Sequence, residues 1–335
     1  MPATVDRPTT RSFAHNPLHC AHAGAYEDAP LDVVDFVARW GSSAVSPFHC
    51  EPGRTIVDLD GQGVAGYAPI RRWAVLPTDV VSPPENERGA LDALMGHLQS
   101  VRRRPVFTAV TSPDAYRRLG YYALRVADDP GVDLAEFSLD GPRMSSLRHS
   151  ISSARRSGLR IVPWSTTLEA EITRVSEDWL RTKRGGEMGF TLGRFDLVDP
   201  ESVDCRAAID RCGNVVGFTT WRSYQNGRGR VLDLMRRSRD APNPTMDLLI
   251  GESLLEFAAA GVRHASLGPV PLSHGPLGER VYPTVSLRRY KEKFAPTWQP
   301  LWFVSPSRLL LPSALRAVAH AFCPDGILNA VRQNA

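Results

Sequence analysis

The chain has 335 residues, 42% hydrophobic and 23% charged, which predicts two globular domains of ordinary size. Its formal net charge of +4 gives only a weak signal about partners, so local clusters of charge carry more information. Five cysteines without a C-x-x-C pair argue against a disulfide framework or a structural zinc site. The sequence shows neither a secretory signal nor an apolar run long enough to span a membrane. We therefore expect a cytoplasmic protein.

Residues 1–30 are rich in Pro, Thr and Ala without periodicity, which predicts a flexible arm. Residues 15–22 gather three His and one Cys, and a metal site is the alternative to a polar arm there. We favour the arm and predict no metal site.

The next segments alternate between helical and strand-like patterns. Residues 31–40 have apolar spacing close to that of a helix, and residues 54–58 and 64–68 flank a turn typical of a hairpin. Further expected elements are a strand at 73–77, a helix ending in Arg102–Arg104, a strand at 105–110, a short helix stopped by Gly120, and another strand. This order predicts a mixed sheet with helices on its faces.

A second unit repeats this outline, although no repeat is visible residue by residue. Its expected helices and strands are a helix at 143–157, a strand near 160, a helix at 167–183, a hairpin at 214–221 and 230–235, a helix at 244–260, a strand at 264–270 and a helix at 288–294. Residues 306–333 are expected to form one or two amphipathic helices. The fold class is therefore α/β, with α+β mixed sheets.

The opening helix of the second unit is basic along its whole length and contains no acidic residue. Surface helices usually mix the two signs of charge, whereas arginines separated by small residues suit a phosphate backbone. The alternative is a solvated or internally paired basic face. The candidate tRNA-binding residues are Arg143, Arg148, Arg155, Arg156 and Arg160.

Asp233 lies between two leucines in an expected central strand, where a carboxylate is costly without a partner or a function. Arg236 follows three residues later and can approach Asp233 only if the strand ends or bulges, because side chains alternate between faces. A structural ion pair is the alternative for Asp233. Asp247 begins the next helix, where a complement to the helix dipole is the alternative reading.

Two turns add candidate substrate contacts. Glu187 lies in a glycine-rich stretch that ends with Arg194, and freed backbone N–H groups there could face an anion or a carbonyl; an ordinary connection is the alternative. Gly268 ends a strand in the segment SLGPVPLS, which runs to Ser273 and forms a rigid turn of the kind that often borders a substrate in α/β folds.

Several segments together resemble the C-terminal domain of the phosphatidylglycerol lysyltransferases, in the same order as in that family. They are GYAPIRRWAVLPTDVVSPPE (66–85), YRRLGYYALRVADDPGVDLAEFSLDG (116–141), RMSSLRHSISSARRSGL (143–159), WLRTKRGGEMGFTLGRFD (179–196), LDLMRRSRDAPNPTMDLLI (232–250), SLGPVPLS (266–273) and LRRYKEKFAPTW (287–298). The resemblance covers roughly residues 33–303.

The resemblance implies two tandem GNAT-type acyltransferase units and transfer of an aminoacyl group from aminoacyl-tRNA to a hydroxyl or amine. The expected organisation is an arm at 1–30, a first unit at 31–142, a catalytic unit at 143–305 and a helical tail at 306–335. It also implies that Asp233 and Asp247 lie at or near the aminoacyl site, and that a lysine, Lys293 or else Lys291, is important for catalysis. We therefore expect Asp233, Arg236, Lys293 and Lys291 as catalytic residues.

The chain departs from the family pattern at two places in the first unit. Residues 77–79 read Pro-Thr-Asp where the family commonly has Gly-Asp-Pro, and residues 126–129 read Val-Ala-Asp-Asp where it has Gly-Glu-Glu-Ala. These departures put both phosphatidylglycerol as acceptor and lysine as transferred group in doubt. We expect a small soluble acceptor, as in natural-product biosynthesis, with transfer to phosphatidylglycerol at a membrane surface as the alternative.

Two other functions are weaker. An acetyl-CoA acyltransferase needs a pyrophosphate-binding turn that opens a helix, whereas the nearest match, at 155–160, closes one. An inactive RNA-binding module is the other alternative. No nucleophile elbow, phosphate-binding P-loop or metalloprotease motif is present, so we expect no cofactor and no DNA partner. The tRNA ester is already activated, so the protein needs mainly to orient it and to stabilise an oxyanion.

Overall fold

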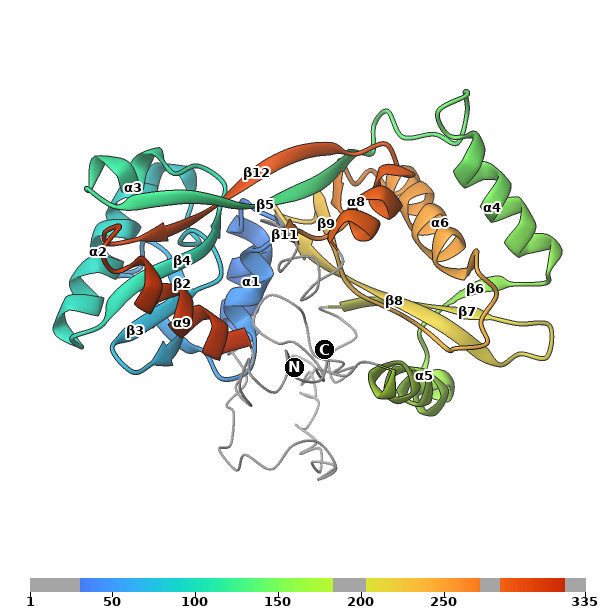
Figure 1. Ribbon diagram of the computed structural model, residues 1–335, viewed down its shortest axis with the longest axis horizontal. Coiled ribbons are helices and arrows are strands. Elements are labelled where there is room, and N and C mark those ends of the chain that lie inside the picture. Colours follow the sequence, from blue (N-terminus) through green and yellow to red (C-terminus); the bar gives the residue numbers. More distant parts are fainter. Residues whose placement is uncertain (1–30, 183–202, 272–283, 323–335) are drawn as a thin grey trace, which may run out of the picture.

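The structure is a computed structural model that describes residues 31–182, 203–271 and 284–322 (Figure 1). Its helices are α1 (Leu31–Trp40), α2 (Glu87–Ser100), α3 (Asp114–Arg118), α4 (Ser145–Arg156), α5 (Glu169–Arg181), α6 (Thr245–Ala259), α8 (Thr284–Glu292) and α9 (Leu311–Phe322), with short 3-10 turns η1 (Ser46–Cys50), η2 (Pro84–Asn86) and η3 (Thr166–Leu168). Its strands are β1 (Thr55–Asp58), β2 (Val64–Ile70), β3 (Trp73–Leu76), β4 (Arg104–Val110), β5 (Tyr122–Asp133), β6 (Arg160–Pro163), β7 (Val203–Ile209), β8 (Val215–Tyr224), β9 (Gly229–Arg237), β10 (His264–Ser266), β11 (Val270–Pro271) and β12 (Thr297–Ser305).

All twelve strands belong to one mixed sheet in the order β1-β2-β3-β4-β12-β5-β10-β9-β8-β7-β6, with β11 paired to β5. Two neighbouring pairs, β3 with β4 and β9 with β10, are parallel, and the other pairs are antiparallel. β5 and β12 are long strands that run from one half of the molecule to the other (Figure 1). The mixed α/β fold expected from the sequence is confirmed.

In the first half, alternate residues of each strand face two different helices. Ala74 and Leu76 of β3 pack with α2, whereas Trp73 and Val75 pack with α9 on the other face. This period of two is the usual pattern of a strand buried on both sides.

In the second half, α4 and α6 cover one face and α5 covers the other (Figure 1). Trp221 and Leu232 pack with α4 and α6, while Phe218 and Leu234 pack with α5. The two faces thus have separate cores, and side chains of β8 and β9 are directed to one or the other.

The elements expected from periodicity are present, but two strands were not anticipated. β7 joins β8 at the outer part of the sheet, and β12 inserts between β4 and β5. β12 contains Pro300 followed by four consecutive apolar residues, so it lacks the alternation typical of a strand, and its pairing with two distant strands is not visible in the local pattern. Among the described helices, none is both long and apolar enough to cross a bilayer.

Candidate functional site

A β-bulge occurs at Asp233 in the middle of β9. Two adjacent residues of β8, Thr220 and Trp221, pair with Leu234 and Leu232 of β9. Asp233 lies between these two and has no opposite residue in β8, so it is the additional residue of the bulge. An additional residue reverses the alternation of side chains beyond it. Asp233, Leu234 and Arg236 therefore all point to the face covered by α5. This is the break that an approach of Arg236 to Asp233 requires, because without it the two side chains would lie on opposite faces.

Asp233 belongs to a buried network of three charges. Its Oδ2 accepts a hydrogen bond from Nε of Arg222 at 2.8 Å, and the Nη2 of Arg222 lies 2.7 Å from Glu51. The side chains of Asp233, Arg222 and Glu51 are 2%, 19% and 6% exposed. Burial by itself lowers the pKa of the Arg222 guanidinium, but the carboxylates of Glu51 and Asp233 raise it above its usual value.

Arg236 is also buried on this face. Its Nη1 donates to Oγ of Ser176 at 2.5 Å, and its guanidinium lies 5.1 Å from the ring of Trp179, both residues of α5. An arginine held by an aromatic face and a hydroxyl is oriented rather than mobile. Asp233 and Arg236 thus share one face of the sheet with α5.

Asp247 and Lys293 form a second group, on the opposite face. Nζ of Lys293 lies 2.9 Å from Oδ2 of Asp247, whose side chain is buried near the start of α6. The hydroxyl of Tyr290 is adjacent, and burial, followed by the Asp247 charge, raises its pKa well above 10.0. Within the described residues, the Tyr290 hydroxyl and Oδ1 of Asp247 have no other side-chain or backbone hydrogen-bond partner, so the two polar groups face each other in a buried position.

Lys291 is buried close by and takes a different partner. Its Nζ donates to the carbonyl of Gly268 at 2.7 Å. Gly268 has φ +83°, and a Cβ there would lie 3.2 Å from the carbonyl of Leu232, so this turn favours glycine. Burial lowers the pKa of Lys291 from 10.5 to about 7, and the nearby Asp129 charge opposes that shift. Lys291 is thus readily deprotonated near neutral pH.

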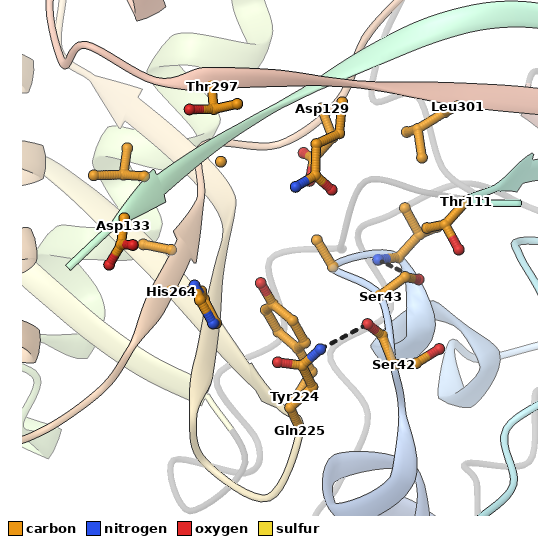
Figure 2. Close-up of a pocket in the computed structure, with 16 residues that line it drawn as sticks. Ser42, Ser43, Thr111, Asp129, Asp133, Tyr224, Gln225, His264, Thr297 and Leu301 are labelled. Atoms are coloured by element: carbon orange, nitrogen blue, oxygen red, sulfur yellow. Dashed lines mark hydrogen bonds between the residues drawn. The ribbon is translucent and has the colours of Figure 1, made fainter. Parts of the chain in front are cut away.

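Asp129, whose charge acts on Lys291, also lines a cavity of about 350 Å³ between the two halves of the molecule (Figure 2). The Tyr224 ring points toward Asp129 across this cavity, and burial, followed by the Asp129 charge, raises the pKa of Tyr224 above 10.0. Burial likewise raises the pKa of Asp129, while Ser266 donates a hydrogen bond to its carboxylate. The other polar side chains of the lining include Ser42, Ser43, Thr111, Gln225, Thr297 and Gln299.

The structure therefore divides the predicted site residues into groups. Asp233 and Arg236 face α5, whereas Asp247 and Lys293 meet on the face of α6, with Lys291 and Gly268 bonded to each other. We expected Asp233, Arg236 and Lys293 to converge on one point, and the bulge instead directs the first two away from α6. Glu187, Arg194 and Ser273 lie outside the described residues, as does the His-rich segment near the N-terminus.

Four residues of these groups were not singled out from the sequence: Glu51, Arg222, Tyr224 and Tyr290. Arg222 had a usable signal, because an arginine flanked by Trp and Ser in an apolar strand needs a buried partner. Asp129 had been noted only as a departure from the family pattern. Glu51 had no signal, since it lies in a turn far from β9 in the sequence.

The basic helix is α4, and its arginines are exposed. Its apolar face, with Leu147 and Ile151, packs on α6. Two of the arginines have internal contacts: Arg148 donates to the carbonyls of 139 and 141, and Arg155 lies 2.7 Å from Glu252. Among the described residues, Arg143, Arg156 and Arg160 form no ion pair with a carboxylate.

The sequence profile of a known family, described as "Phosphatidylglycerol lysyltransferase, C-terminal", matches residues 36–305. The chain belongs to this family. The matched segment contains every described strand and every described helix, apart from α9 and the first residues of α1.

Curated relatives agree with this assignment. The chain is 28% identical over 263 residues to the lysylphosphatidylglycerol biosynthesis bifunctional protein LysX of Mycobacterium avium, covering 70% of this chain and 22% of the relative. The LysX protein of Nocardia farcinica is 31% identical over 245 residues, covering 63% of this chain and 21% of the relative. The chain thus spans about a fifth of the length of these curated relatives.

Solved structures show the same fold. The C-terminal domain assigned to lysylphosphatidylglycerol synthetase from Agrobacterium fabrum superposes with a TM-score of 0.76 at 22% identity, covering 87% of this chain and 97% of that one. L-PGS from Bacillus licheniformis has a TM-score of 0.76 at 21% identity, covering 89% and 98%. At this identity the likeness concerns the fold.

The low pKa of Lys291 predicts a pH dependence of stability. Between pH 7 and 10.5 the unfolded chain holds this proton and the folded chain releases it, so stability rises with pH in that window. Below about pH 7 both states are protonated and the cost of burial is fully present. Lys291→Met should therefore flatten the rise in urea unfolding free energy between about pH 7 and about pH 9.

Arg289→Met, which removes an exposed charge from the same helix, is the matched control and should keep the rise. Identical pH slopes for Lys291→Met and the unaltered protein would mean that Lys291 keeps an ordinary pKa.

Proposed function

We propose that this chain transfers an aminoacyl group from aminoacyl-tRNA to a hydroxyl of phosphatidylglycerol. The observation that carries the proposal is the family match over residues 36–305, which includes both groups of predicted site residues that the structure describes. The relatives named above are lysylphosphatidylglycerol enzymes or domains assigned to them. Lysyl is accordingly the first aminoacyl group to test.

The acceptor in this proposal differs from the small soluble molecule expected from the sequence. The comparisons support the lipid better, because the family description and the names of the relatives all refer to phosphatidylglycerol or its lysyl ester. The residues that line the described cavity do not favour a natural-product acceptor specifically. The assay below includes a soluble acceptor for comparison.

The proposed reaction needs no further reactant. The acceptor hydroxyl oxygen attacks the ester carbonyl of the aminoacyl-tRNA, the bond from that carbonyl to the ribose oxygen breaks, and the hydroxyl proton ends on the ribose oxygen. The protein has to orient two substrates and stabilise the negative charge that develops on the carbonyl oxygen.

The geometry supplies candidates for each task. The cavity between the two halves presents Tyr224, Thr111 and a carboxylate, Asp129, which suit the hydroxyl groups of a glycerol headgroup. Lys293, partly exposed beside Asp247, is placed to donate to an oxyanion. Asp247, which lies beside Lys293 on the same face of the sheet, is the candidate for binding the α-amino group of the aminoacyl moiety, because Asp233 faces α5 on the other side.

The first prediction concerns the reaction itself. Purified protein given radiolabelled lysyl-tRNA and phosphatidylglycerol vesicles should form a labelled lipid, and RNase treatment of the tRNA should abolish it. Parallel reactions contain other charged tRNAs, or a water-soluble polyol or amine in place of the lipid. Label transferred only to the water-soluble acceptor, or equal activity with an acyl-CoA donor, would reject the proposal.

The second prediction concerns Lys293 and Asp247, the pair on the α6 face. Loss of one group that stabilises a transition state typically lowers turnover by on the order of a hundredfold or more. Lys293→Ala and Asp247→Asn should each show such a loss with nearly unchanged tRNA affinity. Asp178→Asn, which removes a more exposed carboxylate from α5, should keep full activity.

Circular dichroism decides between the two readings of Asp233. If Asp233→Asn unfolds the protein, the carboxylate serves the buried network with Arg222 and Glu51. If Asp233→Asn, Asp247→Asn or Lys293→Ala is folded and keeps full turnover, the residue that it replaces takes no part in the reaction.

The third prediction concerns α4 and the arginines that flank it. Arg143, Arg156 and Arg160 are exposed and free of carboxylate partners among the described residues, so they are the best candidates for phosphate contacts. Replacing all three with Ala should reduce the slope of log K against log salt for tRNA binding by about 0.7–0.9 for each phosphate that the protein no longer neutralises. Arg88→Ala, which removes an exposed charge from α2, is the control, and an unchanged slope in the triple variant would assign α4 a purely structural role.

A further inference from the structure

Five arginines gather at one edge of the first half, where β3 and β4 begin. β3 and β4 are parallel, so their starts lie side by side, with Trp73 opposite Arg104. The N–H of Arg104 donates to the carbonyl of Arg72 at 2.8 Å, and the guanidinium of Arg103 donates to the carbonyl of Arg71 at 2.6 Å. The two turns are thus tied together, and we call this surface the arginine edge: Arg71, Arg72, Arg102, Arg103 and Arg104.

The positive charge of the arginine edge is not neutralised locally. Arg71, Arg72, Arg102 and Arg104 are exposed. Across the three described stretches of the chain, no arginine of this edge forms an ion pair with a carboxylate. Arg71 and Arg102 also have φ of 53° and 55°, a backbone region that arginine seldom adopts. Apart from Arg103, whose guanidinium bonds to backbone carbonyls, the edge presents its positive charges to solvent.

Large apolar side chains are exposed beside these arginines. Val101 precedes the second turn and is 43% exposed, and Leu309, just before α9, is 92% exposed. The neighbouring Leu310 and Leu311 pack in the same cluster as Trp73, which follows Arg72, so the start of α9 lies next to the edge. Arg308 adds a further exposed cation.

The arginine edge and the basic helix α4 are at opposite ends of the molecule. β12 starts near the second half and ends in the first half, far from α4. β4 runs in the opposite direction, so the start of β4 lies beside the end of β12, at the side of the first half that is farther from α4. Figure 1 shows α4 at one end of the molecule and the helices and strands of the first half at the other. A tRNA held by α4 would leave the arginine edge free for a different anionic partner.

Clustered arginines with protruding apolar side chains suit the surface of an anionic bilayer. Each arginine near such a surface is attracted by the anionic headgroups, while an aliphatic side chain such as Leu309 enters the boundary of the acyl chains. RNA presents phosphates but no apolar layer for Leu309 and Val101. The combination therefore favours a lipid surface over a second stretch of RNA.

We propose that the arginine edge and Leu309 dock the protein on a membrane rich in anionic phospholipid. The biological use of this docking rests on the proposed lipid acceptor, because it would bring the protein to the surface that contains that substrate. The binding itself requires only the charge and the exposed apolar side chains.

The test measures binding of the full chain to vesicles of phosphatidylcholine alone and of equal parts phosphatidylcholine and phosphatidylglycerol. Only the anionic vesicles should bind, and less at high salt. Arg72→Ala/Arg104→Ala should bind at least about tenfold more weakly. Arg143→Ala/Arg156→Ala, which removes the same charge from just before α4 and from its last residue, is the matched control and should bind vesicles within about twofold of the unaltered protein.

Leu309→Ser tests the apolar contribution. It should weaken the vesicle binding that remains at high salt, when electrostatic attraction is screened. Equal vesicle binding by the edge variant and the α4 control would overturn the proposal. So would a loss of tRNA affinity in the edge variant with unchanged vesicle binding, because the edge would then be a nucleic-acid surface.

Transfer to a short-chain phosphatidylglycerol dispersed without vesicles separates docking from chemistry. Arg72→Ala/Arg104→Ala should keep its turnover there, since neither residue lies near the cavity or the buried charges. Vesicle binding that depends on the edge, without any transfer by the unaltered protein, would reject the proposed function and leave the docking proposal intact. Transfer without edge-dependent binding would reject only the docking.

Discussion

The pairing of β5 with β12 is the constraint on which the arrangement of this molecule depends. The nine residues of β12 pair along almost the whole of β5, from Thr297 opposite Gly131 to Ser305 opposite Tyr122. Near one end β12 also pairs with β4, while at the other end β5 pairs with β10. Two halves that would otherwise be joined by loops are therefore parts of one hydrogen-bonded sheet, which limits their relative motion. The cavity lined by Asp129 and Leu301 lies along this pairing, so its shape follows from the register of the two strands.

The charges buried around this junction have opposing or hydrogen-bonding partners, as the cost of burying an isolated ion requires. Arg222 lies between Asp233 and Glu51 on one face, while Lys293 meets Asp247 on the other. Such pairs are expensive compared with apolar packing, so they are weak arguments for stability. Their value lies in holding polar groups at defined positions in a water-poor region, where electrostatic stabilisation of a reaction is most effective.

The molecule also separates its exposed positive charge. α4 lies in the second half, and the arginine edge lies at the far end of the first. With the cavity between them, a donor with a long phosphate backbone and an anionic acceptor surface can approach from different sides. A net charge of only +4 conceals this pattern, because acidic side chains elsewhere offset the two clusters.

The local pattern of residues was sufficient for most helices and strands, since apolar periods of 3.6 and 2 reflect contacts with a nearby core. The same reasoning placed a costly carboxylate at Asp233 and required a break in β9 for any approach by Arg236, and a bulge is present there. The family, too, was recognisable from its ordered motifs. The strands β7 and β12 were not predicted, because the pairing of a strand depends on partners that lie far away in the sequence.

The sequence by itself determined which residues are too costly to bury alone, which helix is uniformly basic, and which turns need glycine, because these properties belong to the residues and their immediate neighbours. Only the tertiary structure decided which partners they meet. Arg222 of β8 contacts Asp233, and Glu51, at the end of η1, contacts Arg222. Asp233 and Arg236 lie on the face opposite Asp247 and Lys293. A one-residue change in strand register exchanges the two faces of a sheet, and register is set by contacts along the whole strand rather than by any single residue.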